Sequence, residues 1–116
     1  MIQVTPQMRV FVASEPADFR CGIDGLARRV RAALGGDPMS GAVFLFGNRR
    51  GTAVKLLCYD GQGFWLCQKR LSEGRFRHWP RGDEPAAALA PHELAVLLCG
   101  GDYAKARGAP LWRQVA

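Results

Sequence analysis

Arginine and lysine are the side chains that this sequence gathers closely enough to form a chemical site. Eight of them lie in one window: Arg49, Arg50, Lys55, Lys69, Arg70, Arg75, Arg77 and Arg81. The window contains only Asp60 and Glu73 as acidic residues, so it carries the whole net charge of +6. A local excess of positive charge is typical of a surface that binds phosphates. The alternative is a solvated sheet edge, where Lys and Arg prevent unwanted strand pairing.

The carboxylates and histidines, by contrast, form no catalytic pattern. Asp18, Asp24 and Asp60 each fall where a helix cap or a turn explains them, whereas two-metal phosphoryl transfer needs acidic ligands that converge. His78 and His92 have no Ser, Cys or carboxylate beside them in a recognised catalytic order. Neither a GxxxxGK[ST] phosphate loop nor an HExxH motif is present. The sequence therefore predicts a protein that is not an enzyme and uses no cofactor or metal.

The four cysteines are Cys21, Cys58, Cys67 and Cys99. They form no Cys-x-x-Cys pair and have no histidine at ligand spacing, which is a poor match to zinc modules. We expect four reduced thiols with a packing role, because free cysteine is among the most buried residue types.

The basic window is positioned by a predicted β-hairpin. Its strands run from Ala53 to Tyr59 and from Phe64 to Arg70, on either side of the glycine-rich turn at 60–63. Loops of two and of four residues are both possible, so the register stays open. Because both faces are apolar near the turn, we expect these strands to be central and covered on both faces, or curled into a barrel. A third strand from Arg75 to Trp79 would extend the hairpin into a meander.

The hairpin also determines where the polar side chains lie. Lys55, Gln68, Lys69 and Arg70 are expected at its rim, at the end away from the turn. Arg49 and Arg50 enter the hairpin at that end, so they can converge with Lys69 and Arg70.

Aromatic residues interleave with the basic ones in the same window. They are Tyr59, Trp65, Phe76 and Trp79. Such interleaving is found in single-strand binders that stack bases on aromatic rings. Core packing of a small sheet explains the same four rings, because each ring buries a large area.

The remaining elements follow from local patterns. Strands are expected from Met8 to Ala13 and from Ala42 to Gly47, and Ala86 to Ala90 is either a short strand or merely extended. One helix, capped by Asp18 or Asp24, would bury Leu26, Val30, Ala33 and Leu34 and end at Gly35. A second helix would cover His92 to Cys99, with Pro91 in its first turn and Leu94, Leu97 and Leu98 facing the core.

The first helix also presents Arg28, Arg29 and Arg31 on its outer face. These residues could contact phosphate or simply be solvated, since phosphate contacts need only charge.

Together these elements predict a single α+β domain over residues 1–102. It has a mostly antiparallel sheet of about five strands, a central hairpin or meander, and two helices. Residues 103–116 are expected to form an extended or disordered tail. A chain of 116 residues with 48% apolar content suits one globular core. No apolar run approaches the roughly 20 residues that span a bilayer, and the start is not a secretory signal, so we expect a cytoplasmic protein.

The order of these motifs resembles the TnpB-type accessory proteins of the insertion-sequence family sixty-six. The segments that carry the resemblance are Phe19-Arg20, Gly22, Asp24-Gly25-Leu26, Pro38, Ser40-Gly41, Phe44, Phe46, Arg49-Arg50-Gly51, Val54-Lys55-Leu56-Leu57, Asp60-Gly61-Gln62-Gly63-Phe64-Trp65-Leu66, Lys69-Arg70-Leu71, Gly74-Arg75-Phe76 and Trp79-Pro80. The family pattern passes from Phe to Trp through one residue, whereas here Arg77 and His78 both intervene, which predicts a bulge that re-aims Trp79. Cys21 stands where the family usually has a basic residue, and Tyr59 where it usually has Trp.

The resemblance implies a role in moving a bacterial mobile element, beside the transposase that the element encodes. We therefore expect a non-catalytic accessory protein that binds DNA or a transposase–DNA assembly. The residues expected to contact phosphate are Arg49, Arg50, Lys55, Lys69, Arg70, Arg75 and Arg77. The alternative is a protein-interaction subunit of the transposase that does not touch DNA. Neither hypothesis involves a membrane or a small-molecule substrate.

Overall fold

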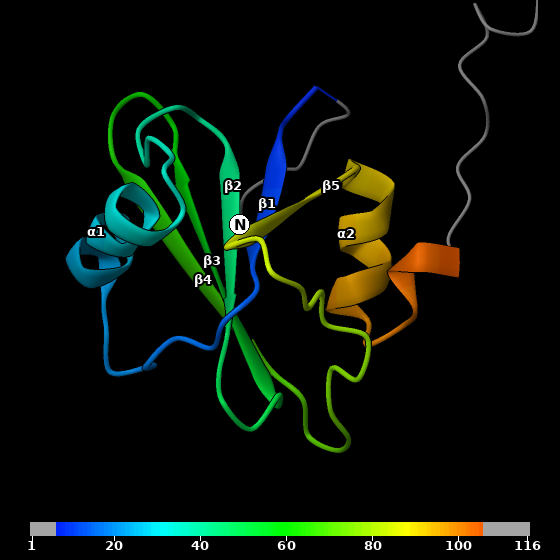
Figure 1. Cartoon of the computed structure of the whole chain (residues 1–116). Helices are drawn as coiled ribbons and strands as arrows, with labels where there is room; N and C mark the ends of the chain where they lie inside the picture. Colours follow the sequence, from blue (N-terminus) through cyan, green and yellow to red (C-terminus); the bar gives the residue numbers. More distant parts are fainter. Residues whose placement is uncertain (1–6, 106–116) are drawn as a thin grey trace, which may run out of the picture.

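The predicted hairpin forms the longest strands of a five-stranded sheet in the computed structural model, which describes residues 7–105 (Figure 1). The strands are β1 (Val10–Ala13), β2 (Val43–Gly47), β3 (Ala53–Tyr59), β4 (Phe64–Arg70) and β5 (Ala86–Leu89). The helices are α1 (Ile23–Ala33), α2 (Pro91–Leu98) and a short 3-10 turn, η1 (Tyr103–Lys105). The expected α+β domain with two helices and a five-stranded, mostly antiparallel sheet is confirmed.

The strand order is β4-β3-β2-β1-β5. β1 and β2 are parallel, with Val10 opposite Val43, and α1 lies in the connection between them. This arrangement agrees with the general rule that parallel neighbours need a long crossover. All other pairs are antiparallel, and β5 pairs with β1 so that Val10 also lies opposite Leu89. Of the 86–90 segment, which the sequence left open, residues 86–89 thus form an edge strand.

The two helices cover opposite faces of the sheet (Figure 1). On one face Leu94 and Leu97 of α2 pack with residues of β1, β2 and β3. On the other, Leu26 and Val30 of α1 pack with Phe46 and its neighbours. Alternation along β3 sends successive side chains into these two clusters, so β3 is covered on both faces, as predicted. β4 is instead an edge strand and only partly covered, which corrects that expectation for the second strand of the hairpin.

The hairpin turn is a four-residue loop in which Tyr59 lies opposite Phe64. Asp60 closes this loop, because its carboxylate accepts hydrogen bonds from the N–H groups of Gln62 and Gly63, both at 2.9 Å, and from the Trp65 indole at 2.7 Å. The N–H of Gly63, followed by those of Gln62 and Trp65, lowers the pKa of Asp60 below its ordinary value. Gly61 supplies the positive φ of 95° that the turn requires.

The expected third strand from Arg75 to Trp79 is wrong, and with it the bulge at Arg77 and His78. This segment crosses the end of the sheet instead of running beside β4. The N–H of Phe76 donates to Gly51 O at 2.7 Å, and the Phe76 ring is buried in the cluster beneath α2. The indole N–H of Trp79 donates to Ala13 O at 2.9 Å. Burial of two aromatic rings therefore takes the chain across toward β5.

The two helices begin in different ways, and the start of α1 also differs from the prediction. Gly22 is the N-cap of α1 and makes no side-chain cap hydrogen bond, so capping by Asp18 or Asp24 is wrong. Leu26 and Val30 of α1 are fully buried, as expected. Ala33 is exposed and Leu34, the C-cap, is only half-buried, which corrects the expectation that both are buried. α2 begins with Pro91 in its first turn, and Glu93 accepts a hydrogen bond from the Ala90 N–H at 2.8 Å. Glu93 therefore satisfies a backbone donor at the start of α2.

All four cysteines are free thiols. Cys58 is buried, and burial raises the pKa of its thiol. Cys21 and Cys67 are half-buried, whereas Cys99 is exposed, so the expected packing role does not extend to Cys99.

The segment expected to form the tail begins with η1, and Tyr103 packs against the cluster under α2. The rest of that segment lies outside the described residues.

A glycine in β2 provides a test of this packing. A Cβ on Gly47 would lie 3.2 Å from two atoms of the Trp79 ring, and this ring is held by its hydrogen bond to Ala13. We expect Gly47→Ala to lower the free energy of unfolding by about 1–3 kcal/mol through overpacking. Gly63→Ala is the matched control, because nothing lies within 4 Å of a Cβ at that position. Equal stability of both variants in urea unfolding would contradict the tight packing of Trp79 on β2.

The hairpin turn should respond to acid. Because the folded-state pKa of Asp60 is depressed, its bond to Trp65 persists at neutral pH and is lost as pH falls through that pKa. The NMR signal of the Trp65 indole N–H should therefore shift with a midpoint below about 3.9, the usual aspartate value. The same signal in Asp60→Asn should not show that transition. A midpoint at or above the usual value would contradict the hydrogen-bonded turn.

Candidate nucleic-acid interface

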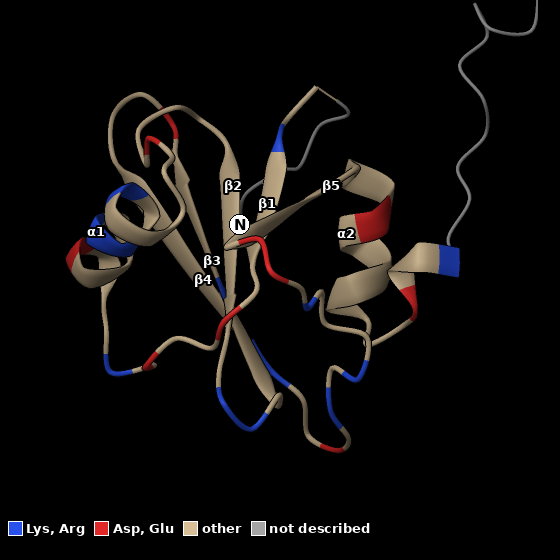
Figure 2. Ribbon diagram, in the orientation of Figure 1, with Lys and Arg blue, Asp and Glu red and all other residues tan. Residues whose placement is uncertain are grey.

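Exposed arginines gather at the end of the sheet opposite the β3–β4 turn (Figure 2). We call this the basic end and define it by Arg49, Arg50, Arg70, Arg75 and Arg77. The first two lie in the β2–β3 loop, Arg70 ends β4, and the last two lie in the segment that crosses the end of the sheet.

The β2–β3 loop that carries Arg49 and Arg50 is shaped by Asn48. Its side-chain oxygen accepts hydrogen bonds from the N–H groups of Thr52 at 2.9 Å and Ala53 at 3.1 Å, and its amide nitrogen donates to the Thr52 hydroxyl at 3.0 Å. Gly51 then adopts a φ of 73°, which favours glycine. These contacts fix the loop from within, so both arginine side chains remain at its exposed tip.

Main-chain hydrogen bonds bring the other three arginines to this loop. Arg70 lies opposite Ala53 in the β3–β4 ladder, and the N–H of Leu71 donates to Thr52 O at 2.9 Å. The bond from Phe76 to Gly51 holds Arg75 and Arg77 on either side of it. The backbone segments that carry Arg49, Arg50 and Arg70 therefore lie side by side, and Arg75 and Arg77 join them from a loop rather than from a strand.

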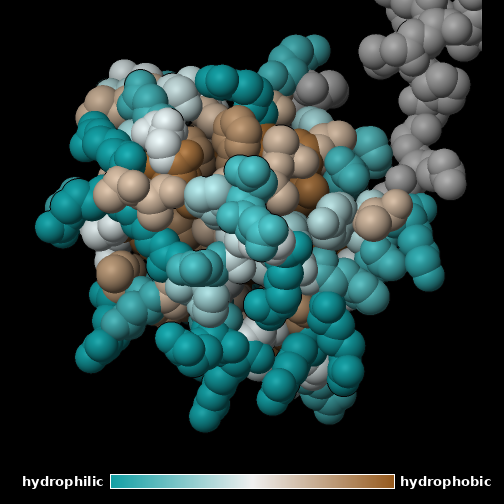
Figure 3. All heavy atoms as spheres, in the orientation of Figure 1, coloured by the Kyte–Doolittle hydropathy of each residue, from teal (hydrophilic) through white to brown (hydrophobic). Residues whose placement is uncertain are grey.

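Solvent surrounds these five side chains, and none forms a hydrogen bond or ion pair with the part of the chain that the structure describes. The space-filling view shows hydrophilic side chains projecting from this end (Figure 3). Glu73 is the acidic residue of the neighbouring turn, and it is also exposed. The positive charge of the basic end is thus largely uncompensated and free to meet an external anion.

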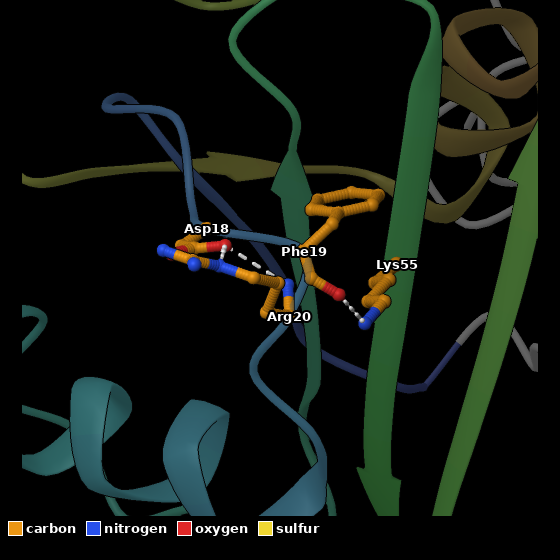
Figure 4. Close-up of polar contacts among 4 residues, drawn as sticks. All are labelled: Asp18, Phe19, Arg20 and Lys55. Atoms are coloured by element: carbon orange, nitrogen blue, oxygen red, sulfur yellow. Dashed lines mark hydrogen bonds and ion pairs between the residues drawn. The ribbon is translucent and has the colours of Figure 1, made fainter.

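A shallow depression of about 310 Å³ adjoins the basic end. It is lined by Pro16, Ala17, Asp18, Phe19, Asn48, Arg49 and Arg50. The Asp18 carboxylate accepts hydrogen bonds from the Arg20 guanidinium and backbone N–H, the shortest at 2.7 Å (Figure 4). These bonds, led by the guanidinium, lower the pKa of Asp18 to about 2. Asp18 is therefore ionised but neutralised by Arg20, which reduces its repulsion of an incoming anion.

Lys55 does not belong to the basic end, which corrects the expectation that it lies at the rim. Its side chain is buried under the segment between β1 and α1, with 7% exposure. The ammonium donates to Phe19 O and Cys21 O, both at 2.8 Å, and lies 5.0 Å from the centre of the Phe19 ring (Figure 4). These contacts make Lys55 a structural residue.

Lys69 is also drawn away from the basic end. Its ammonium donates to Leu98 O at 2.6 Å, at the carboxyl end of α2. A cation there interacts favourably with the exposed carbonyls and the helix dipole. The proposed role of Lys69 as a phosphate contact therefore competes with a contact inside the protein.

The arginines of α1 likewise include one that is bound within the protein and two that are exposed. Arg29 donates to Pro16 O and Glu15 O, both at 3.0 Å, and its guanidinium lies 5.9 Å from the centre of the Phe46 ring. Arg28 and Arg31 remain exposed. Sequence reasoning missed the structural roles of Arg29 and Asn48; the Asn-x-x-Gly spacing of a turn was the available signal for Asn48.

Of the four interleaved aromatic residues, most serve packing. Phe76 is buried, Trp79 packs against the cluster under α2, and the Tyr59 ring packs on Phe64 with centroids 5.0 Å apart. Trp65 is 46% exposed, but it lies in β4 near the turn and its indole binds Asp60. The core-packing alternative therefore fits Phe76 and Trp79.

Within residues 7–105, no group of three or more His, Cys, Asp or Glu residues is placed to hold a metal ion. None of the helices in that range is long and apolar enough to cross a bilayer.

Comparison with known proteins identifies the family of this fold. The family described as IS66 Orf2 like protein matches residues 8–108, which include the whole sheet, both helices and the basic end. The chain belongs to the IS66 Orf2-like family. Membership of this insertion-sequence family implies an accessory role in transposition.

Two proteins of Sinorhizobium fredii are similar to this IS66 Orf2-like chain over most of their length. The uncharacterized protein y4hO is 40% identical over 103 residues, which is 89% of each chain. The uncharacterized protein y4jC is 34% identical over 113 residues, covering 97% of this chain and 96% of the relative. No solved structure matches the chain significantly.

The structural assignment of Lys55 can be tested by stability. Lys55→Met keeps most of the unbranched side chain but removes the ammonium that donates to Phe19 O and Cys21 O. We expect the free energy of unfolding to fall by about 1–3 kcal/mol, the usual cost of removing one partner of a buried hydrogen bond. Arg77→Ala, a change at the exposed basic end, should stay within about 0.5 kcal/mol of wild type. If urea unfolding shows both variants unchanged, Lys55 is not a structural residue.

Proposed function

We propose that this IS66 Orf2-like protein serves transposition as a non-catalytic factor that binds DNA, or a transposase–DNA assembly, through its basic end. The observation that carries the proposal is the convergence of Arg49, Arg50, Arg70, Arg75 and Arg77 on one exposed end, without partners among the described residues. Lys55 and Lys69 leave the predicted set, because their ammonium groups are bound within the protein.

The chemistry of arginine favours phosphate as the ligand. A guanidinium presents a planar fork of donors that matches two phosphate oxygens, and it stays charged at any physiological pH. The five arginines come from three separate segments, so they can follow a backbone that carries one charge every few ångströms. Contacts of this kind position a protein on DNA without reading its sequence.

The acidic residues support a non-catalytic role. Asp18 is bound by Arg20 and Asp60 by the hairpin turn, so each has a structural partner. Phosphoryl transfer by metal ions requires carboxylates that converge on one point. Strand cleavage is therefore assigned to the transposase of the same element, and this protein acts beside it.

Charge reversal at the basic end tests the DNA interface. In Arg49→Glu/Arg50→Glu, affinity for mixed-sequence duplex DNA should fall, and the slope of log affinity against log salt should decrease by about two, one for each lost phosphate contact. The preference among DNA sequences should not change. Fluorescence anisotropy at several salt concentrations measures affinity and slope.

The matched control is Arg28→Glu/Arg31→Glu, which makes the same charge change on the exposed face of α1. It should bind nearly as wild type does if the site is local. Circular dichroism checks that both variants are folded. Equal loss in both variants would indicate a general charge effect, and absence of wild-type binding at low salt would leave the transposase-interaction subunit as the function.

A further inference from the structure

We infer that the outer edge of β4 is an interaction surface for a second copy of this chain, which pairs with it antiparallel about a two-fold axis centred on Cys67. Within residues 7–105, no strand pairs with this side of β4. The strand is seven residues long, whereas β5, which forms the opposite edge, has four. A long unpaired edge is a template for pairing with another chain.

The ladder shows which backbone groups are available. Asp60 and Gly63 are joined by a backbone hydrogen bond, as are Thr52 and Leu71. Because bonded and non-bonded pairs alternate in an antiparallel ladder, β4 bonds to β3 through Trp65, Cys67 and Lys69. The N–H and C=O groups of the alternate residues therefore point away from β3; these residues are Phe64, Leu66, Gln68 and Arg70.

This alternation matches a two-fold centred on Cys67. Such pairing sets Leu66 opposite Gln68 and Phe64 opposite Arg70 of the other copy, and these are the residues with free backbone groups. It also uses the full length of β4, whereas a two-fold centred on Leu66 or Gln68 leaves one end of each strand unpaired. Cys67 would then lie opposite itself in a non-hydrogen-bonded pair, where side chains are closest.

The side chains are complementary in the same register. Phe64 of one copy lies opposite Arg70 of the other, so an aromatic ring faces a guanidinium. Trp65 lies opposite Lys69, whose aliphatic stem can pack on the ring while its ammonium stays on Leu98 O. Moving the axis to Lys69 or Arg70 would set like charges against each other. The ionised Asp60 at the β3–β4 turn would also approach the basic end of the other copy.

Positive charge on an edge strand ordinarily discourages pairing. In β4 the ammonium of Lys69 is held by Leu98 O on the α2 side, so it does not block the edge. Trp65, at 46% exposure, is the large exposed hydrophobic side chain of this strand. Pairing would cover its ring.

A proline placed at an outward N–H tests the pairing. Gln68→Pro removes a donor that faces away from β3, so the β3–β4 ladder is retained, as proline tolerates edge positions of this kind. Gln68→Thr is the matched control, because it keeps the N–H. By sedimentation velocity over a range of concentrations, without DNA, wild type and Gln68→Thr should dimerise. In Gln68→Pro the dimer dissociation constant should rise at least about tenfold, since two symmetry-related hydrogen bonds are lost.

Disulfide trapping provides a test that needs no change to the backbone. In Cys21→Ser/Cys99→Ser the thiols that remain are Cys67 and the buried Cys58. Mild oxidation should link two copies through Cys67, and the linked species should disappear in Cys21→Ser/Cys67→Ser/Cys99→Ser. Cys21→Ser/Cys67→Ser, which keeps the exposed Cys99, measures linkage by random collision.

The inference is overturned if the protein stays monomeric at all concentrations. It is also overturned if the protein forms a dimer that Gln68→Pro does not weaken and that oxidation of Cys67 does not link. If the chain is monomeric but Gln68→Pro abolishes binding to the transposase, the edge belongs to that partner and not to a second copy. The DNA-binding test changes other residues and does not depend on these outcomes.

Discussion

The arrangement around α1 depends on the contacts of one buried, charged side chain, Lys55. A buried ammonium is costly unless hydrogen bonds replace its water. Here the carbonyls of Phe19 and Cys21 do so, and the Phe19 ring adds a cation–π contact. These bonds tie the segment between β1 and α1 to the middle of β3, so the crossover that makes β1 and β2 parallel is fastened to the hairpin.

The fixed position of this crossover segment also shapes the surface beside the basic end. The same segment includes Pro16 and Phe19, which line the depression beside Arg49 and Arg50. Arg29 holds it from the other side through Glu15 and Pro16. Lys55 and Arg29 thus hold this segment through hydrogen bonds within the protein. As a result, a wall without net charge lies beside the exposed side chains of Arg49 and Arg50. The division between bound and free cations, rather than the net charge, defines the candidate DNA surface.

Residue type alone did not reveal that division. Lys55, Lys69 and Arg29 bind carbonyl oxygens, whereas the five arginines of the basic end are exposed. Sequence reasoning grouped Lys55 and Lys69 with the arginines, because a local charge count cannot show where carbonyl acceptors from distant segments lie. Phe19 and Cys21 accept from Lys55 and Leu98 accepts from Lys69, and each acceptor is far from its lysine in the sequence.

The sequence by itself determined the features that depend on near neighbours. The bounds of the hairpin strands, the buried strand before Gly47 and the start of α2 at Pro91 agree with structure, because alternation, turn glycines and proline act within a few residues. Only the tertiary structure decided the strand order, the edge position of β4 and the path of residues 75–79. Those features depend on which distant partners bury Phe76 and Trp79 and pair with β1, and such long-range contacts leave no periodic mark in the chain.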